Sequence, residues 1–258
     1  MSWLMRITSP GPASPYARIS FSDHVYVYEE ETMSGHCLYY LGSPHLDMLD
    51  THDYVRAIYR AKSITTIWSS IQRLTNSTLW QYDNSTLFFN DASFSLSLKD
   101  ENIALEELVD PFKNHNFERV LRSNQYHNYL HLAATDDLVH NVLLLLNDAY
   151  SYTQFFYINL YKIVETIQND WRATNIASYS TDAKAAYDFL NGSNVRGYMN
   201  NFIASGLYSR HGFTNRNAAA PSILNPPPVE NIKEELLCLI NGWLNYKIDP
   251  NRISYKLR

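Results

Sequence analysis

The chain begins with short stretches in which hydrophobic and polar side chains alternate. These stretches are Tyr16–Ser22, His24–Glu30 and Gly35–Leu41, with turn residues between them. A period of two, in segments rich in aromatic and β-branched residues, is typical of half-buried strands. The clearest example is Val25–Tyr28, which reads Val-Tyr-Val-Tyr. The pattern therefore predicts three strands in this region.

The period then changes, and Asp50–Leu74 has hydrophobic residues at helical spacing. Ile58, Ile67 and Ile71 fall near one face of such a helix. Asp50 or Thr51 is suited to cap its N-terminus, because both side chains accept hydrogen bonds from unpaired backbone N–H groups. We expect this helix to pack on the sheet.

A short sequence that occurs twice follows the helix. Asn76–Trp80 and Asn84–Phe88 share the letters Asn-Ser-Thr-Leu before an aromatic residue. The simplest interpretation is two strands joined at Asp83-Asn84, residues that tolerate the positive φ of a hairpin turn. Ser93–Leu98 alternates as a further strand. Strands, a long helix and more strands predict an α+β module, which we assign to residues 1–115.

After about Asp110 the hydrophobic period becomes 3.6 residues, which predicts an all-α bundle over residues 116–258. The expected helices are Tyr126–Ala133, Asp136–Leu146, Thr153–Asp170, Thr181–Leu190, Val195–Ser205 and Glu230–Tyr246. The predicted fold class is therefore α+β: a mixed strand and helix module followed by a helical bundle.

Composition and charge restrict the function. Hydrophobic residues make up 45% of the chain and charged residues 18%, as in a packed globular protein. The net charge of −5 excludes a generally basic nucleic-acid-binding surface. The stretch Asn194–Arg216 is locally basic, however, because it holds Arg196, Arg210 and Arg216 and no acid. Any nucleic-acid contact is expected there.

Several features predict a cytoplasmic protein without a membrane segment, metal or cofactor. The N-terminus lacks a signal-peptide core, and no hydrophobic run approaches the ~18 residues of a membrane span. Cys37 and Cys238 match no metal or redox spacing. His127 and His131 are four residues apart on a predicted helix, but the glutamate of the metalloprotease motif is missing, so we interpret them as surface or packing residues.

Arg210-His211-Gly212 is the most suggestive short motif. A glycine after a histidine suits a helix end or a sharp turn. An arginine beside an imidazole that titrates near neutrality could bind a phosphate and move a proton. The alternative is a helix terminus whose side chains bond to neighbouring carbonyls. Lys162 and Glu165, three apart on a predicted helix, form either a surface ion pair or a support for a site.

Several segments together resemble a group of uncharacterised bacterial proteins with a helical C-terminal domain. They are Leu130–Asp137, Leu160–Ile167, the turn ending in Arg210–Gly212, the proline loop Asn225–Pro228 and the closing helix with Trp243. That helical domain is in turn similar to HEPN-type domains of toxins and anti-phage defence proteins. The resemblance covers most of the chain through short motifs.

The resemblance implies RNA chemistry. Many HEPN proteins are metal-independent ribonucleases that act as dimers, with an arginine four to six residues before a histidine. Here Arg210 and His211 are adjacent, so the expected function is a non-enzymatic subunit or sensor that binds a partner protein or nucleic acid in a bacterial defence or regulatory complex. The alternative is an endoribonuclease effector. A homodimer or a larger complex is expected, with RNA as a candidate partner.

The candidate site residues take their roles from the ribonuclease hypothesis. In the ribonuclease, Arg210 and His211 are catalytic: the histidine handles protons and the arginine stabilises charge on the phosphate. Arg216 and Arg196 bind the nucleic acid. Lys162 and Glu165 support the pair.

Overall fold

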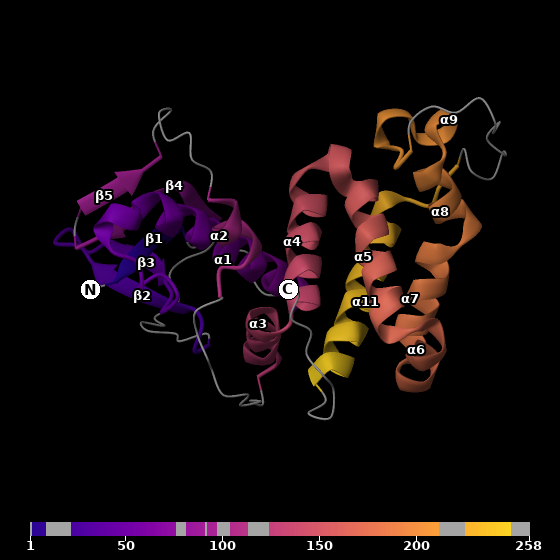
Figure 1. The fold of residues 1–258 in the computed structure, drawn as a ribbon, viewed down its shortest axis with the longest axis horizontal. Helices are drawn as coiled ribbons and strands as arrows, with labels where there is room; N and C mark the ends of the chain where they lie inside the picture. The colour runs from indigo at the N-terminus through magenta and orange to yellow at the C-terminus, as the bar shows by residue number, and fades with distance from the viewer. Residues whose placement is uncertain are drawn as a thin grey trace. The chain divides into compact units, whose positions relative to one another are not determined.

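A computed structural model describes residues 2–8, 22–75, 81–90, 92–96, 104–112, 124–211 and 225–248, with side chains omitted at 81–85 and 173–174. The described residues form two compact units: unit 1 ends at His140 and unit 2 begins at Asn141. The division therefore falls inside helix α4 (Asp137–Ser151), further along the chain than the predicted division after residue 115. Figure 1 shows the elements of both units.

Unit 1 contains a five-stranded antiparallel sheet in the order β2-β3-β1-β4-β5. The strands are β1 (Trp3–Thr8), β2 (Tyr26–Glu31), β3 (Cys37–Gly42), β4 (Gln81–Phe89) and β5 (Ala92–Ser95). Two predicted strands, His24–Glu30 and Gly35–Leu41, correspond to β2 and β3. The third, Tyr16–Ser22, lies outside the described residues except for Ser22. With its helices, this sheet makes the chain an α+β protein, as predicted.

The central strand β1 was not predicted. Its side chains nevertheless alternate: Trp3, Met5 and Ile7 are buried, and the residues between them are more exposed. Met5 is opposite Leu41 of β3 on one side and Leu87 of β4 on the other. The hydrophobic Leu4 between Trp3 and Met5 interrupts the period of two in the sequence, so the alternation of β1 is clear only in the burial of its side chains.

The predicted hairpin at Asp83-Asn84 is wrong. Strand β4 continues through both residues, but its pairing with β1 shifts register there: Tyr82 is opposite Ile7 and Leu87 is opposite Met5. Residues 83–86 thus form an irregularity within one strand and not a turn between two. The turn to β5 comes later, at Asn90, whose φ of +47° lies in the left-handed region that asparagine tolerates better than most residues. Phe89 and Ala92 are opposite one another across that turn. The segment Asn76–Trp80 lies outside the described residues.

The predicted long helix is confirmed as a short 3₁₀ turn, Thr51–Asp53, followed by α1 (Tyr54–Leu74). The Asp50 carboxylate accepts hydrogen bonds from the backbone N–H groups of His52 and Asp53, as expected of a cap. Helix α1 packs against β4 and against α2 (Leu105–Val109), a helix that was not predicted (Figure 1).

A buried carboxylate fastens α2 to α1. Glu107 accepts hydrogen bonds from Arg56 Nη2 at 2.6 Å and from Arg60 Nε at 2.6 Å. Arg60 also donates to the carbonyl of His45 at 2.7 Å. Burial by itself raises the pKa of the Glu107 carboxyl, but the hydrogen bonds from Arg60 and Arg56 outweigh it, so the pKa lies below its ordinary value. Unit 1 is completed by α3 (Gln125–Thr135) and the start of α4.

Every regular element described in unit 2 is a helix, as predicted for the C-terminal half. After the rest of α4 come a 3₁₀ turn (Thr153–Phe155), α5 (Phe156–Trp171), α6 (Ala173–Tyr179), α7 (Thr181–Asn191), α8 (Ser193–Asn200), α9 (Phe202–Ser205), the 3₁₀ turn η3 (Gly206–Tyr208) and α11 (Val229–Ile248). The closing helix α11 packs on α7 and α5 (Figure 1). Between α5 and α11, Asp170 accepts hydrogen bonds from Trp243 Nε1 at 2.7 Å and Lys247 Nζ at 2.9 Å.

One predicted helix, Val195–Ser205, is divided in two. The break falls at Asn201, whose extended backbone ends α8 and whose side-chain oxygen accepts from the N–H groups of Ile203 and Ala204. An asparagine side chain competes well for backbone donors and therefore favours a new helix start. Helix α6 was not predicted.

Candidate functional site

Three of the predicted site residues converge on a single aromatic ring in unit 2, that of Tyr161. The Arg210 guanidinium carbon lies 3.4 Å from the centroid of this ring, and that of Arg196 lies 5.9 Å from it. The Tyr161 hydroxyl donates a hydrogen bond to Glu165 Oε1 at 3.1 Å. We call Tyr161, Glu165, Arg196 and Arg210 the arginine–tyrosine cluster.

The cluster is assembled from three elements. Tyr161 and Glu165 are one turn apart on α5, so their side chains lie on the same face. Arg196 projects from α8. Arg210 follows η3, where its backbone N–H donates to the carbonyl of Met199 near the C-terminus of α8, at 2.7 Å. This bond holds the Arg210 segment against the helix that carries Arg196.

Both guanidinium groups keep donors available for a ligand. Arg196 Nη1 donates to Asn191 Oδ1 at 2.7 Å, and Arg196 and Arg210 are exposed. In the described part of the chain, neither arginine forms a salt bridge with an acid. A guanidinium stacked on a ring presents its N–H groups edgewise, in the fork that matches a phosphate. The cluster is thus suited to bind an anion.

His211 is next to Arg210 in sequence, but nothing in the described residues holds its imidazole. The residue is exposed, and its backbone N–H donates to Ser209 Oγ at 3.2 Å. The predicted alternative, in which both side chains bond to neighbouring carbonyls, does not describe Arg210: its backbone meets a carbonyl and its side chain stacks on Tyr161. A general base held in place by a partner, as proton transfer requires, is therefore not seen here.

Lys162 and Arg216 stand apart from the cluster for different reasons. Arg216 lies outside the described residues. Lys162 is exposed, and no salt bridge joins it to Glu165 among the described residues; Glu165 accepts a hydrogen bond from Tyr161. Burial raises the pKa of the Asp148 carboxyl on α4, and the positive charge of Lys162 opposes part of that rise. The charge of Lys162 thus acts on Asp148 of α4.

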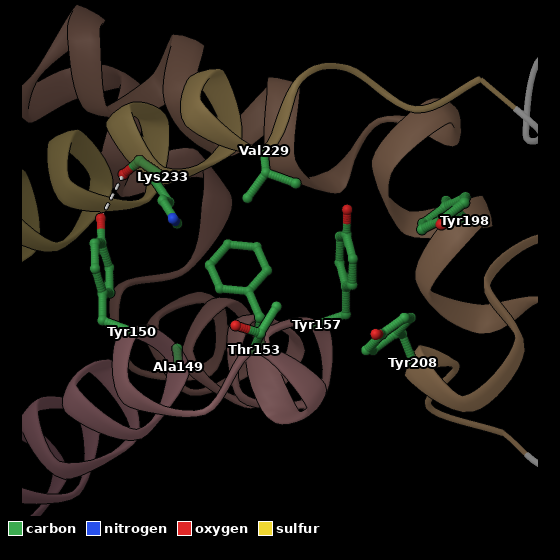
Figure 2. Close-up of a pocket in the computed structure, with 9 residues that line it drawn as sticks. Ala149, Tyr150, Thr153, Tyr157, Tyr198, Tyr208, Val229 and Lys233 are labelled. Carbon is green, nitrogen blue, oxygen red and sulfur yellow. Dashed lines mark hydrogen bonds between the residues drawn. The ribbon is translucent and has the colours of Figure 1, made fainter.

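Unit 2 also contains a cavity of about 260 Å³, drawn in Figure 2. Its walls are mostly aromatic and come from α4, the 3₁₀ turn Thr153–Phe155, α5, α8, η3 and α11. The lining residues are Ala149, Tyr150, Thr153, Phe156, Tyr157, Tyr198, Tyr208, Val229 and Lys233. Tyr157 is one turn before Tyr161, Tyr198 is two residues after Arg196, and Tyr208 is two residues before Arg210, so the same elements build the cavity and the arginine–tyrosine cluster.

Lys233 is the one charged residue among those that line this cavity. Its ammonium nitrogen lies 5.4 Å from the centroid of the Tyr150 ring and 5.9 Å from that of Phe156. Figure 2 shows the Lys233 side chain extending from α11 beside Tyr150. Burial, with a smaller contribution from Tyr198, raises the pKa of Tyr157 to about 12, so its hydroxyl stays protonated at neutral pH.

The sequence interpretation missed every residue of this cavity. The one feature of the sequence that pointed to such a cavity was the abundance of tyrosine, with 20 in the chain. That number does not say which rings meet, because the lining residues come from helices far apart in sequence.

The predicted packing role of His131 is borne out in unit 1. His24 Nδ1 lies 3.0 Å from His45 Nε2, and His24 Nε2 lies 3.5 Å from His131 Nδ1. All three rings are buried, and the rings of His24 and His45 are stacked. Among the described residues, no group of three or more His, Cys, Asp or Glu side chains is placed to hold a metal ion.

Comparisons with models of protein families, with curated proteins and with solved structures gave no match. None of the helices in the described part of the chain combines the length and the hydrophobicity needed to cross a membrane.

Proposed function

We propose that unit 2 is a HEPN-like, non-enzymatic module that binds single-stranded RNA within a bacterial defence or regulatory complex. The observation that carries the proposal is the arginine–tyrosine cluster, in which two exposed arginines meet one tyrosine ring and neither forms a salt bridge with a described acid. Proteins that bind single strands combine cations for the phosphates with aromatic rings on which bases stack. The cluster supplies both, on a chain whose overall charge opposes nonspecific binding.

The geometry favours binding over cleavage. Arg210 is positioned by a backbone hydrogen bond and by the Tyr161 ring, whereas the His211 imidazole has no described partner that would fix its orientation or tautomer. Cleavage by 2′-hydroxyl attack needs a positioned proton acceptor as well as a cation on the phosphate. The exposed imidazole beside Arg210 in sequence keeps the endoribonuclease as the second candidate function.

Fluorescence anisotropy with a labelled single-stranded RNA tests the proposal. We expect the double variant Arg196→Met/Arg210→Met to bind more weakly, and the slope of log affinity against log salt to fall by about 0.7 for each lost phosphate contact. Arg172→Met, which removes one exposed arginine of unit 2 outside the cluster, is the charge-matched control for each single variant, Arg196→Met and Arg210→Met, measured beside the double variant. RNA binding equal in the double variant and the control would refute the proposal.

Two further variants test the role of the tyrosine ring. Tyr161→Leu removes the ring on which Arg210 stacks, so both the aromatic surface and the placement of Arg210 are lost, and we expect binding to weaken by about tenfold or more. Tyr161→Phe keeps the ring, loses only the hydroxyl and should bind like the wild type. Equal effects of the two variants would argue against stacking.

The same RNA, analysed on a denaturing gel after incubation, distinguishes the two candidate functions. The proposal expects intact RNA with the wild type and with His211→Ala. Cleavage by the wild type that disappears in His211→Ala would overturn the non-enzymatic proposal in favour of the endoribonuclease. Light scattering during size-exclusion chromatography would test the homodimer that we also propose.

A further inference from the structure

The cavity beside the arginine–tyrosine cluster has features of a small-molecule site. Ligand sites are concave, mostly apolar and carry a few polar groups that fix orientation. Here Ala149, Phe156 and Tyr157 are buried walls, while Thr153 and Tyr208 are exposed at the rim. The volume of about 260 Å³ is near the lower limit of ligand pockets, about 300 Å³. The space therefore suits a ligand with a single ring system.

The charge inside the cavity decides whether a cation or an anion is the better ligand. A cage of tyrosine rings alone would favour a cation, because ring faces are electronegative. Lys233 already occupies that role, and no acid is among the residues that line the described cavity. Within the described residues its ammonium group makes no salt bridge. The Lys233 ammonium group would repel a second cation, whereas an anion would neutralise its charge.

One further donor favours an anion at this place. Val229, the first residue of α11, also lines this wall, but Glu230 in the same first turn offsets the positive end of the helix dipole, so the dipole adds little here. The Tyr157 hydroxyl is protonated at neutral pH and makes no hydrogen bond with the described residues. It is free to donate to an oxygen of the ligand.

The magnitude of the charge distinguishes a carboxylate from a phosphate. A phosphate monoester carries about −1.5 to −2 at neutral pH. One lysine offsets a single negative charge, which leaves a buried phosphate partly unpaired at considerable cost. A carboxylate carries one charge and is matched by one lysine.

We propose that this cavity binds a small aromatic carboxylic acid, with its ring among the tyrosine and phenylalanine side chains and its carboxylate on Lys233 and Tyr157. The inference goes beyond the proposed RNA binding and does not depend on it. The ring is held by edge and face contacts with Phe156, Tyr157 and Tyr198, whose own rings already pack at centroid distances of 5.2 Å.

Fluorine NMR titration with 4-fluorophenylacetate tests this proposal on the full chain, without RNA. The neutral probe 4-fluorophenylacetamide has nearly the same shape and lacks the charge. We expect the acid to bind at least about tenfold more tightly than the amide, which is the effect of one charge-assisted hydrogen bond. Equal affinity for the two probes, or no binding of the acid, would overturn the proposal.

Matched variants locate the binding. Lys233→Met should reduce the preference for the acid over the amide to near unity. Lys184→Met removes the same charge from α7, away from the cavity, and should leave the preference unchanged. Tyr157→Phe should weaken the acid several-fold and the amide less. Equal preferences in the Lys233 and Lys184 variants, each with a wild-type circular dichroism spectrum, would contradict the assignment.

Two more probes test the chemistry of the ligand. The cation 4-fluorophenethylamine should bind more weakly than the acid; tighter binding would mean a cation cage and would overturn the proposal. Phenyl phosphate, observed by phosphorus NMR, should also bind more weakly than the carboxylate; tighter binding would refute the argument from a single lysine. Loss of RNA binding with retained acid binding would remove the proposed function and leave this inference standing.

Discussion

The buried carboxylate of Glu107 gives the sharpest test of the energetics of unit 1. Its side chain is 0% exposed, and it accepts hydrogen bonds from Arg56 and Arg60. Replacing it with glutamine leaves Arg60, whose side chain is 2% exposed, without its counter-charge. Breaking a buried pair in this way costs about 3–5 kcal/mol. The variant tests whether this contact anchors α2 on α1.

The expected loss of stability in Glu107→Gln lies near the lower end of that range. Arg56 is 40% exposed and can turn to water, so its loss adds less than about 1 kcal/mol. Arg60 keeps its hydrogen bond to the His45 carbonyl, and glutamine retains one oxygen as an acceptor. We therefore expect Glu107→Gln to lower the free energy of unfolding of unit 1 by about 3 kcal/mol.

Urea unfolding followed by hydrogen exchange of peptides from α1 measures this loss in unit 1 alone. At about 1–3 kcal/mol per molar urea, the midpoint should fall by at least about 1 M. Glu106→Gln is the control, because it removes the same charge from the adjacent, exposed position and should change stability by less than about 0.5 kcal/mol. Equal midpoints for the two variants would refute the reasoning.

The pH dependence gives an independent check. The pKa of Glu107 in the folded protein lies below its ordinary value of 4.5. The stabilisation that the ionised Glu107 gives the folded protein is therefore fully present above pH 4.5 and is lost as the pH falls through the folded-state pKa. The difference in stability between wild type and Glu107→Gln should be full at pH 7 and shrink in that acid range. A difference that stays constant into acid would contradict the assignment.

The remaining expectations concern unit stability, measured by thermal or urea unfolding. Gly242→Ala should destabilise unit 2 by ~1–2 kcal/mol, because the new methyl group would lie 2.5 Å from Cβ of Ala183, and this overpacking exceeds the gain in helix propensity. Trp243→Phe should cost about 1–3 kcal/mol, because the buried Asp170 carboxylate loses an indole donor. Arg172→Gly should stabilise unit 2 by about 1 kcal/mol, because a φ of +52° strains a residue with a Cβ; an unchanged or lower midpoint would contradict this reasoning.

The sequence by itself determined most of the helices and their caps. The stripe that includes Ile58, Ile67 and Ile71 predicted α1, and the Asp50 cap is present where the residue type indicated. Such features depend on residues within a few turns of one another, so local spacing carries the information. The all-helical character of unit 2 was predicted for the same reason.

Only the tertiary structure decided the sheet and the site. Strand β4 spans Asp83-Asn84 because β1, from the start of the chain, pairs with it on both sides of a register shift at these residues. The sequence named Arg196, Arg210 and Glu165, but it did not show that they meet at Tyr161, nor that Lys233 faces a cavity of tyrosine rings. Pairing between distant strands and convergence of side chains from separate helices depend on contacts that no local pattern encodes. The residue types fixed the available chemistry, and the packing of α5, α8 and α11 decided where that chemistry lies.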